Sequence, residues 1–311
     1  MTQRLPELVE AFCQYQRKQR GKTAEGVQTY RWILGTFLAF VRIEAGRLGR
    51  VQDVTQEMIQ GWMDEMAGAN LAINTLRCRQ AVLSSFCNWL VKRNLLSLNP
   101  ILRMDRPPHE RKPPAVPGPG IMDALVQAAK DRGHTRDVAI FLLMRYTGMR
   151  RGSVATLRLG QLDAEYGLRA VQVKGGKVRD VPVPAAVMRY LNGYVEEVLR
   201  PVGGKLTADT PLFWSSWGRR EGRVRVPMCG KNIWRLCKLY GARIGHPNLK
   251  PHDLRHGVAM EVLEQRHDLE EVRALLGHAR IDTTQVYTTI RPPQLKKAVS
   301  FYEDRAAEMV G

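Results

Sequence analysis

A proline-dense segment near the middle of the chain limits most strongly how this sequence can fold. Residues 99–120, NPILRMDRPPHERKPPAVPGPG, carry seven prolines and a cluster of charges. Proline cannot continue a helix or a central strand, because its ring fixes φ and removes the backbone N–H donor. The segment therefore predicts an extended linker, 105–118, between a first domain, 1–104, and a second domain, 119–311.

The first domain has a helical pattern throughout. Apolar residues recur at helical spacing in 23–41, 55–66 and 72–96, and threonines stand at the N-cap positions of the first two stretches. Four basic residues lie off the apolar face of the third stretch: Arg77, Arg79, Lys92 and Arg93. They form either a solvated face or a surface that faces phosphates, and the charge of the whole chain favours the second interpretation.

The second domain mixes helices with one β-hairpin. β-branched residues alternate on both sides of Gly175-Gly176 within 168–184, which predicts the hairpin. Helical patterns are expected near 121–130, 135–147, 185–199, 230–243, 252–265, 268–276, 282–290 and 293–308. The predicted fold class is mainly α with a small β-sheet, an all-helical first domain being followed by an α+β domain.

Charge points to a polyanionic partner. The 311 residues include 48 lysines and arginines against 30 acids, a formal net charge of +18, and both domains are positive. Nucleic acid is the commonest partner of such a surface, although charge alone also fits a protein that is merely basic.

Cysteine usage and hydropathy exclude other classes of protein. Five cysteines without a Cys-x-x-Cys pair argue against a disulfide framework and a thiolate zinc site, and favour a reducing cytoplasm. The N-terminus does not read as a signal peptide, and the longest apolar run, residues 138–144, is too short to cross a membrane.

Four clusters in the second domain carry side chains suited to chemistry. In TGMRRGS, residues 147–153, arginines follow directly on an apolar helix, so the core behind can aim them. The hairpin has a lysine on each side of its turn, and exposed hairpin lysines usually serve only solubility. PHDLRH, residues 251–256, and LLGHARIDTTQVY, residues 275–287, bring histidines, an arginine and a tyrosine into short stretches.

The spacing of His252 and His256 also raises the possibility of a zinc site. Two histidines four residues apart share one helix face, as they do in zinc hydrolases. Those sites need a glutamate directly after the first histidine, where this chain has Asp253, and Arg255 would place a positive charge beside the cation. The sequence therefore predicts no metal site.

Together the clusters describe phosphoryl transfer to tyrosine without a metal or another cofactor. Arginine forks clamp a phosphate through two parallel hydrogen bonds, which lysine cannot imitate. Near neutral pH a histidine can take a proton and a lysine can give one. The phenol of Tyr287, with an ordinary pKa of about 10, needs such a base or a cationic field to act as a nucleophile.

In order and spacing, these motifs resemble the tyrosine recombinases of the phage integrase family. TGMR matches the family's first arginine motif, KGGKVRDVP its hairpin motif, HDLRH its His-x-x-Arg box, and LLGHARIDTTQVY its Leu-Leu-Gly-His segment with a tyrosine nine residues on. Asn-Pro at 99–100 also fits the family's core-binding domain. The resemblance implies these catalytic residues: Arg150, Lys174, His252, Arg255, His278 and Tyr287.

The resemblance also implies a mechanism on duplex DNA, held in a C-shaped clamp of two domains. Tyr287 would attack the scissile phosphodiester and leave a 3′-phosphotyrosine and a free 5′-hydroxyl. Arg150, Arg255 and His278 would stabilise the charge on the non-bridging oxygens, while His252 acts as the base and Lys174 as the acid for the leaving oxygen.

Two positions depart from the family pattern. The family often has an acid three residues after its first arginine, where that acid supports the arginine, and this chain has Ser153. Before the hairpin lysine, where glycine is common, this chain has Val173.

The partners that the resemblance implies are double-stranded DNA with paired half-sites and further copies of the chain. A homotetramer would assemble on two DNA sites, with the C-terminal helix exchanged between protomers, in the bacterial cytoplasm or nucleoid and away from the membrane. Two alternatives stay open. A type IB topoisomerase uses nearly the same residues to relax DNA as a monomer, and a non-enzymatic DNA-binding protein would share the charge.

Overall fold

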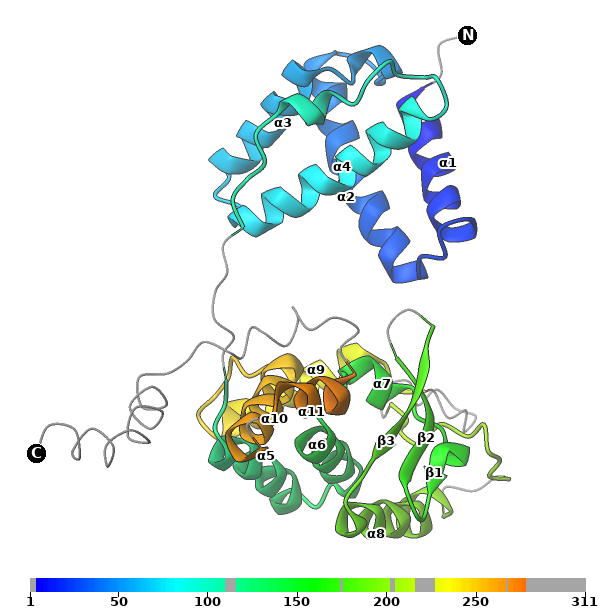
Figure 1. Ribbon diagram of the computed structural model, residues 1–311, viewed down its shortest axis with the longest axis vertical. Coiled ribbons are helices and arrows are strands. Elements are labelled where there is room, and N and C mark those ends of the chain that lie inside the picture. Colours follow the sequence, from blue (N-terminus) through cyan, green and yellow to red (C-terminus); the bar gives the residue numbers. More distant parts are fainter. Residues whose placement is uncertain are drawn as a thin grey trace, which may run out of the picture. The chain divides into compact units, whose positions relative to one another are not determined.

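The computed structural model describes residues 4–109, 116–173, 176–201, 205–215, 227–266 and 268–277. The chain divides into two compact units, Met1–Lys112 and Pro113–Gly311, which Figure 1 shows. The boundary falls inside the segment that was expected to link two domains. Since each unit has a hydrophobic core of its own, each is described by itself.

In the first unit, the described residues form these helices: α1 (Leu5–Lys18), α2 (Ala24–Glu44), α3 (Gln56–Gly68) and α4 (Ile73–Val91). Thr23 and Thr55 cap α2 and α3, as predicted. Their hydroxyls accept the backbone N–H groups of Gly26 and Met58, each at 3.2 Å, so each satisfies a donor that the helix leaves unpaired.

Aromatic rings fill the core of the first unit. Phe12 of α1 packs edge-on against Phe86 of α4, with ring centroids 5.4 Å apart. Phe37 of α2 meets Trp62 of α3 in the same way at 5.3 Å. Each such pair contributes about 0.5–1.5 kcal/mol beyond the burial of its area. These rings hold the helices of the unit together.

Asn99 ties the end of the first unit back to α4. Its buried amide nitrogen lies 3.0 Å from both Ser84 Oγ and Asn88 Oδ1, to which it donates hydrogen bonds. Its side-chain oxygen accepts the backbone N–H of Ile101 at 3.1 Å and so starts a 3-10 turn, Pro100–Arg103. The Asn-Pro pair therefore closes the unit before the proline-dense segment begins.

Of the four basic residues predicted on the third helix, Arg77 and Arg79 lie on α4 and make contacts within the unit. Arg77 donates a hydrogen bond to the backbone oxygen of Pro107 at 2.7 Å. Arg79 lies over the exposed ring of Trp32, 4.7 Å from its centroid, a cation–π contact between α4 and α2. These two side chains are therefore partly used inside the unit.

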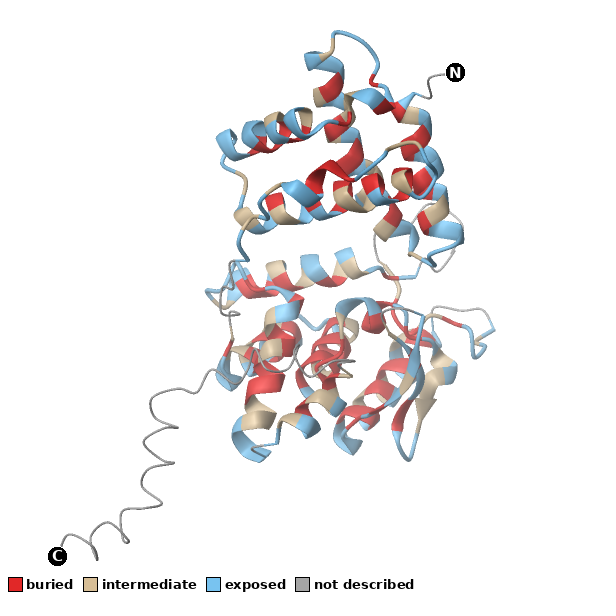
Figure 2. Ribbon diagram, turned by 45° about the horizontal axis from the view of Figure 1, so that its top comes forward, coloured by how far each residue is buried: buried red, intermediate tan, exposed pale blue. Residues whose placement is uncertain are grey.

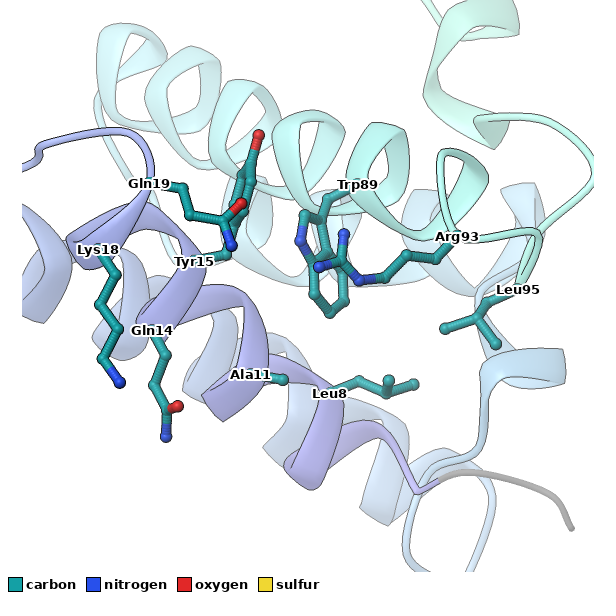
Figure 3. A pocket seen from close by; sticks show the side chains of 9 residues that line it. All are labelled: Leu8, Ala11, Gln14, Tyr15, Lys18, Gln19, Trp89, Arg93 and Leu95. Carbon is teal, nitrogen blue, oxygen red and sulfur yellow. The ribbon is translucent and has the colours of Figure 1, made fainter.

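The other two, Lys92 and Arg93, are exposed at the end of α4. The Arg93 guanidinium stacks 4.1 Å from the centroid of the Trp89 ring. Figure 3 shows Arg93 and Trp89 on a groove between α1 and the end of α4, where Tyr15 and Lys18 also lie. The groove combines an aromatic wall with positive charge.

The second unit surrounds one buried helix, α6 (Thr135–Thr147). Helices α5 (Pro119–Asp131), α7 (Arg151–Ala155), α8 (Ala185–Tyr194) and α10 (Pro251–Arg266) contact it. A single π-helical turn, Val195–Leu199, extends α8. The unit also contains α9 (Gly230–Arg243) and α11 (Leu269–Leu276). Figure 2 shows buried residues gathered where the helices of each unit face one another. No helix among the described residues has the length and apolar character to cross a membrane.

The predicted hairpin is present and belongs to a small antiparallel sheet. Its strands are β2 (Gly167–Gln172) and β3 (Val178–Pro182), and a two-residue strand, β1 (Leu162–Asp163), pairs with β2 on its other side. The buried Leu168 and Val181 are paired across the sheet.

Polar side chains join the helices of the second unit inside and beside its core. Tyr240 of α9 packs edge-on against Phe141 of α6 and donates a hydrogen bond to Asp137 at 2.8 Å. The buried Arg145 of α6 forms ion pairs with Asp123 of α5, at 2.8 Å, and with Glu261 of α10, at 2.5 Å. Three helices are thus fixed around one guanidinium group.

Candidate active site

The chain turns sharply at the end of α6, where the first arginine motif lies. Gly148 ends the helix in the left-handed conformation, with a φ of 59°. A Cβ here would lie 2.8 Å from Leu276 Cδ2 and 3.3 Å from Val258 Cγ1, so glycine allows α10 and α11 to pack this closely. Arg150 follows as the half-buried residue that precedes α7. The packed core behind α6 therefore fixes its backbone.

Arg255 of α10 is held in place by two backbone carbonyl groups. Its side chain is buried, with 4% of the residue exposed. Nη1 donates to the oxygen of Gly148 at 2.6 Å, and Nη2 donates to the oxygen of Leu276 at 2.7 Å. These bonds fix the plane of the guanidinium before a ligand arrives, which is the preorganisation that stabilises developing charge.

A small hollow brings three arginines of the second unit together. Arg150, Arg179 of β3 and Arg255 line it, and the rest of its lining is mostly apolar: Met149, Val171, Val173, Val181 and Leu276. Burial and the positive charge of Arg150 lower the pKa of Arg179, so guanidinium groups of like charge are held close to one another. An anion such as a phosphodiester would relieve this repulsion and could accept forked hydrogen bonds.

Ser153, where the family often has an acid, is buried under the same hollow. Its hydroxyl donates a hydrogen bond to the backbone oxygen of Gln172 at 2.8 Å. Gln172 is the last residue of β2. The serine therefore joins α7, which follows Arg150, to the strand that leads into the hairpin turn.

His252 lies one helical turn before Arg255 on α10 and is exposed. Partial burial, followed by the positive charges of Arg255, Arg151 and Arg150, lowers the pKa of His252. The ring is therefore neutral at neutral pH, which is the state that can accept a proton. The three described catalytic candidates, Arg150, His252 and Arg255, are thus close enough to interact electrostatically.

The pKa of His256 is also lowered. Burial and the neighbouring His252 lower its pKa, and the two rings lie 6.4 Å apart. The carboxylate of Asp253 accepts the backbone N–H of Lys250 at 2.9 Å, at the start of α10. Within the described ranges, no three His, Cys, Asp or Glu side chains are grouped to hold a metal ion.

We expect this histidine pair to make the second unit less stable as pH falls below about 6.5, the pKa of an unperturbed histidine. Because the folded-state pKa values are lowered, the unfolded chain binds these protons more tightly. The contribution of the two neutral histidines to the free energy of unfolding is complete above that pH. It is lost as the pH falls towards their pKa values in the folded state. Thermal unfolding of His256→Asn between about pH 7.5 and about pH 5 should lose less stability than the unchanged protein. The exposed His246 supplies the control variant, His246→Asn. If His256→Asn and this control lost the same stability over this pH range, the expectation would be contradicted.

The structure describes the residues on both sides of positions 174–175 in the hairpin turn. Val173 N–H donates to the oxygen of Lys177 at 2.8 Å, and Gly176 has a φ of 73°. A three-residue loop with glycine in the left-handed region is a common hairpin connection. Lys177 is exposed. Lys174 lies outside the described residues.

Three of the predicted catalytic residues, Lys174, His278 and Tyr287, lie outside the described residues, as do the helices expected at 282–290 and 293–308. The helix expected near 268–276 is present as α11, and Gly277 ends it in the left-handed conformation, with a φ of 62°. The described chain therefore reaches the residue before His278.

Arg179 and Arg151 were not among the residues predicted for the site. Arg179 lines the hollow, and Arg151 acts electrostatically on His252. Arg179 stands at the arginine position of the hairpin motif and Arg151 directly follows Arg150, so both lay inside quoted motifs. Their neighbours in space could not be read from those motifs.

Comparison with protein families gives two matches along the chain. Residues 9–94 match the family described as phage integrase, N-terminal SAM-like domain, and residues 121–293 match the phage integrase family. Among curated relatives, tyrosine recombinase XerC of Roseiflexus castenholzii is 28% identical over 309 residues, which cover 98% of this chain and 96% of that protein. Tyrosine recombinase XerD of Staphylococcus epidermidis is 27% identical and covers 96% of this chain and 99% of its own.

Solved structures share the fold at low sequence identity. XerH site-specific recombinase bound to difH substrate in a pre-cleavage complex gives a TM-score of 0.67 at 20% identity, covering 94% of this chain and 84% of that one. A lambda integrase dimer bound to a COC' core site gives a TM-score of 0.67 at 16% identity, and the match covers 92% of this chain and 77% of that one. Because the match to the integrase model alone spans more than half of the residues, the chain belongs to the phage integrase family, that of the tyrosine recombinases.

Proposed function

We propose that this protein is a site-specific DNA recombinase that cleaves and rejoins DNA strands through a 3′-phosphotyrosine intermediate. One observation carries the proposal: Arg150 and Arg255 line one hollow beside Arg179, and two carbonyl groups fix the guanidinium of Arg255. A phosphodiester is the ligand that such a set of guanidinium groups suits. Relatives named tyrosine recombinases match over nearly the whole chain, which supports the same function.

In the proposed reaction the Tyr287 oxygen attacks phosphorus, and the bond from phosphorus to the 5′-oxygen breaks. His252, which is neutral because its pKa is lowered, takes the phenol proton, and Lys174 gives a proton to the leaving oxygen. Arg150, Arg255 and His278 stabilise the charge that develops on the non-bridging oxygens. A free 5′-hydroxyl of another strand then reverses these steps and rejoins the DNA.

In the proposed mechanism no ATP is needed, because the phosphotyrosine bond retains the energy of the broken phosphodiester, and no metal is needed, because guanidinium groups stabilise the developing charge. The test is to trap the covalent complex on genomic DNA fragments, with and without EDTA, and to sequence the trapped DNA. The proposal expects one recurring site and equal trapping in both arms. A metal requirement would overturn this mechanism, and random trapped sequences would exclude a site-specific enzyme.

The partners we propose are double-stranded DNA with paired half-sites and other copies of the chain, in the bacterial cytoplasm. Solved neighbours include a lambda integrase tetramer bound to a Holliday junction, which supports a tetramer here too. We propose that segment 293–308 is exchanged between its protomers.

Two other functions were open from the sequence. A type IB topoisomerase would relax DNA as a monomer, and an architectural protein would bind without cutting. The relatives that span the chain are named recombinases, so neither alternative is favoured. Exchange of flanking DNA between two sites on separate molecules would distinguish recombination from relaxation.

We expect Lys174→Ala to be badly impaired on ordinary DNA and to recover when sulfur replaces the bridging 5′-oxygen. A thiolate leaves without a proton, so the general acid becomes unnecessary. The matched control is Lys177→Ala on the opposite side of the turn, where the lysine is exposed. Its effect should be small and similar on both substrates. Rescue of Lys177→Ala by sulfur instead of Lys174→Ala would place the acid on the other side of the turn.

A further inference from the structure

Helix α11 is too short to be stable alone, and its two ends are strongly capped. It has eight residues, whereas isolated helices below about 12–15 residues are marginal in water. At its start, Asp268 accepts the backbone N–H groups of Glu270 and Glu271 at 2.7 Å and 3.4 Å. At its end, the helix presents the carbonyl groups of Ala274, Leu275 and Leu276, of which that of Ala274 also accepts the backbone N–H of Gly277 at 3.1 Å.

Two arginines from other elements satisfy those three carbonyl groups. Arg179 of β3 donates from Nη1 to the oxygen of Ala274 at 2.8 Å and from Nη2 to that of Leu275 at 2.6 Å. Arg255 donates to the oxygen of Leu276 at 2.7 Å. The positive groups also face the negative end of the helix dipole. The end of α11 is therefore fixed from both β3 and α10.

Gly277 and Arg179 fit one another closely. A Cβ on Gly277 would lie 2.7 Å from Arg179 Nη1, so the guanidinium occupies the space that a side chain would need. The same glycine has a φ of 62°, a conformation that glycine adopts without strain. The guanidinium thus packs against the backbone at the point where the chain continues to His278.

The position of Arg179 is electrostatically unfavourable for a merely structural residue. Its pKa is lowered by burial and by Arg150, and in the described part of the chain it pairs with carbonyl groups and with no carboxylate. A neutral donor could hold the same carbonyls without this repulsion.

We propose that Arg179 is a positioning residue that fixes the direction in which the chain leaves α11 towards His278. It is on β3, the strand that follows the hairpin turn, so one side chain joins this strand to the end of α11, where Gly277 directly precedes His278 in the sequence. This inference rests on the proposed function, because His278 matters only if phosphoryl transfer occurs.

A double-mutant cycle separates positioning from stability. Single-turnover cleavage is measured for Arg179→Gln, His278→Ala and the double variant. A misplacement of about 1 Å can cost about a hundredfold in rate, so Arg179→Gln alone should lose about 30- to 100-fold. In the His278→Ala background the same change should cost less than about threefold, because residues that act together are not additive. Full additivity would overturn the proposal.

The matched control is Arg169→Gln, an exposed arginine on β2 that pairs with Asp180. It should leave cleavage unchanged in both backgrounds. If Arg179→Gln does not fold, Arg179→Lys takes its place, since lysine keeps the charge and reaches one carbonyl group.

A second readout does not depend on activity. In protein labelled at its histidines, NMR should show that Arg179→Lys shifts the His278 resonance, identified as the signal lost in His278→Ala. Arg169→Lys should leave that resonance unchanged. An unmoved resonance would overturn the positioning role even in an active enzyme. If the unchanged protein cleaves no DNA while the resonance does shift, the proposed function fails and the positioning of His278 stands.

Discussion

Tyr287→Phe is expected to bind target DNA as tightly as the unchanged protein and to form no covalent complex with it. The substitution removes only the phenolic oxygen, which is the nucleophile of the proposed reaction. Phenylalanine keeps the aromatic ring and loses one oxygen only, so the affinity for DNA should change little. The rate of strand cleavage should fall by more than about ten thousandfold, as when a nucleophile is removed from other enzymes.

The measurement uses end-labelled DNA that carries the trapped site. Denaturing gels report the covalent band, and native gels report binding. Tyr166→Phe is the matched control, because Tyr166 is an exposed tyrosine of the same unit, just before β2. It should give the full covalent band. An undiminished band from Tyr287→Phe would exclude this tyrosine as the nucleophile.

Arg255→Lys is expected to lose cleavage about 100- to 1,000-fold, the usual effect of removing one preorganised donor to a developing charge. The lysine ammonium is a single point of charge. It cannot reach the oxygens of Gly148 and Leu276, which two nitrogens of Arg255 contact, and still present a fork to a phosphate. The affinity for DNA should change little, because many other basic residues contribute to it.

Single-turnover cleavage and equilibrium binding, measured at one salt concentration, check this expectation. Arg243→Lys is the control, since Arg243 is exposed at the end of α9. Thermal unfolding shows whether the variant remains folded at the assay temperature. Equal cleavage by Arg255→Lys and Arg243→Lys would show that Arg255 does not act on the phosphate.

The sequence predicts those parts of the fold that local chemistry determines. Thr23 and Thr55 are N-caps because their hydroxyls can accept a nearby N–H, and Gly148 ends α6 because it adopts positive φ. The bounds 230–243 coincide with α9. The strand β1 was not predicted, since two residues carry no alternating pattern and pair only because β2 lies beside them.

The residues of the site also differ in whether local sequence or tertiary packing determines their contacts. Ordered motifs pointed to Arg150, His252 and Arg255, and the structure places these residues together. Arg179 and Ser153 could not be assigned roles from the motifs, because their partners are backbone carbonyl groups. Every residue of the chain carries a backbone carbonyl group, so the sequence contains no signal for which of them a given side chain will contact. Only the packing of β2, β3 and α11 creates it.

Each unit closes a hydrophobic core of its own, around Phe12 and Phe86 in the first and around Phe141 and Tyr240 in the second. A substitution that weakens one core therefore leaves the contacts of the other in place. Selection acts on a protein once its stability falls below a threshold. Because each unit has its own core, each unit has its own stability to maintain. Sequence changes in the helices before the proline-dense segment can therefore accumulate without weakening the core of the second unit.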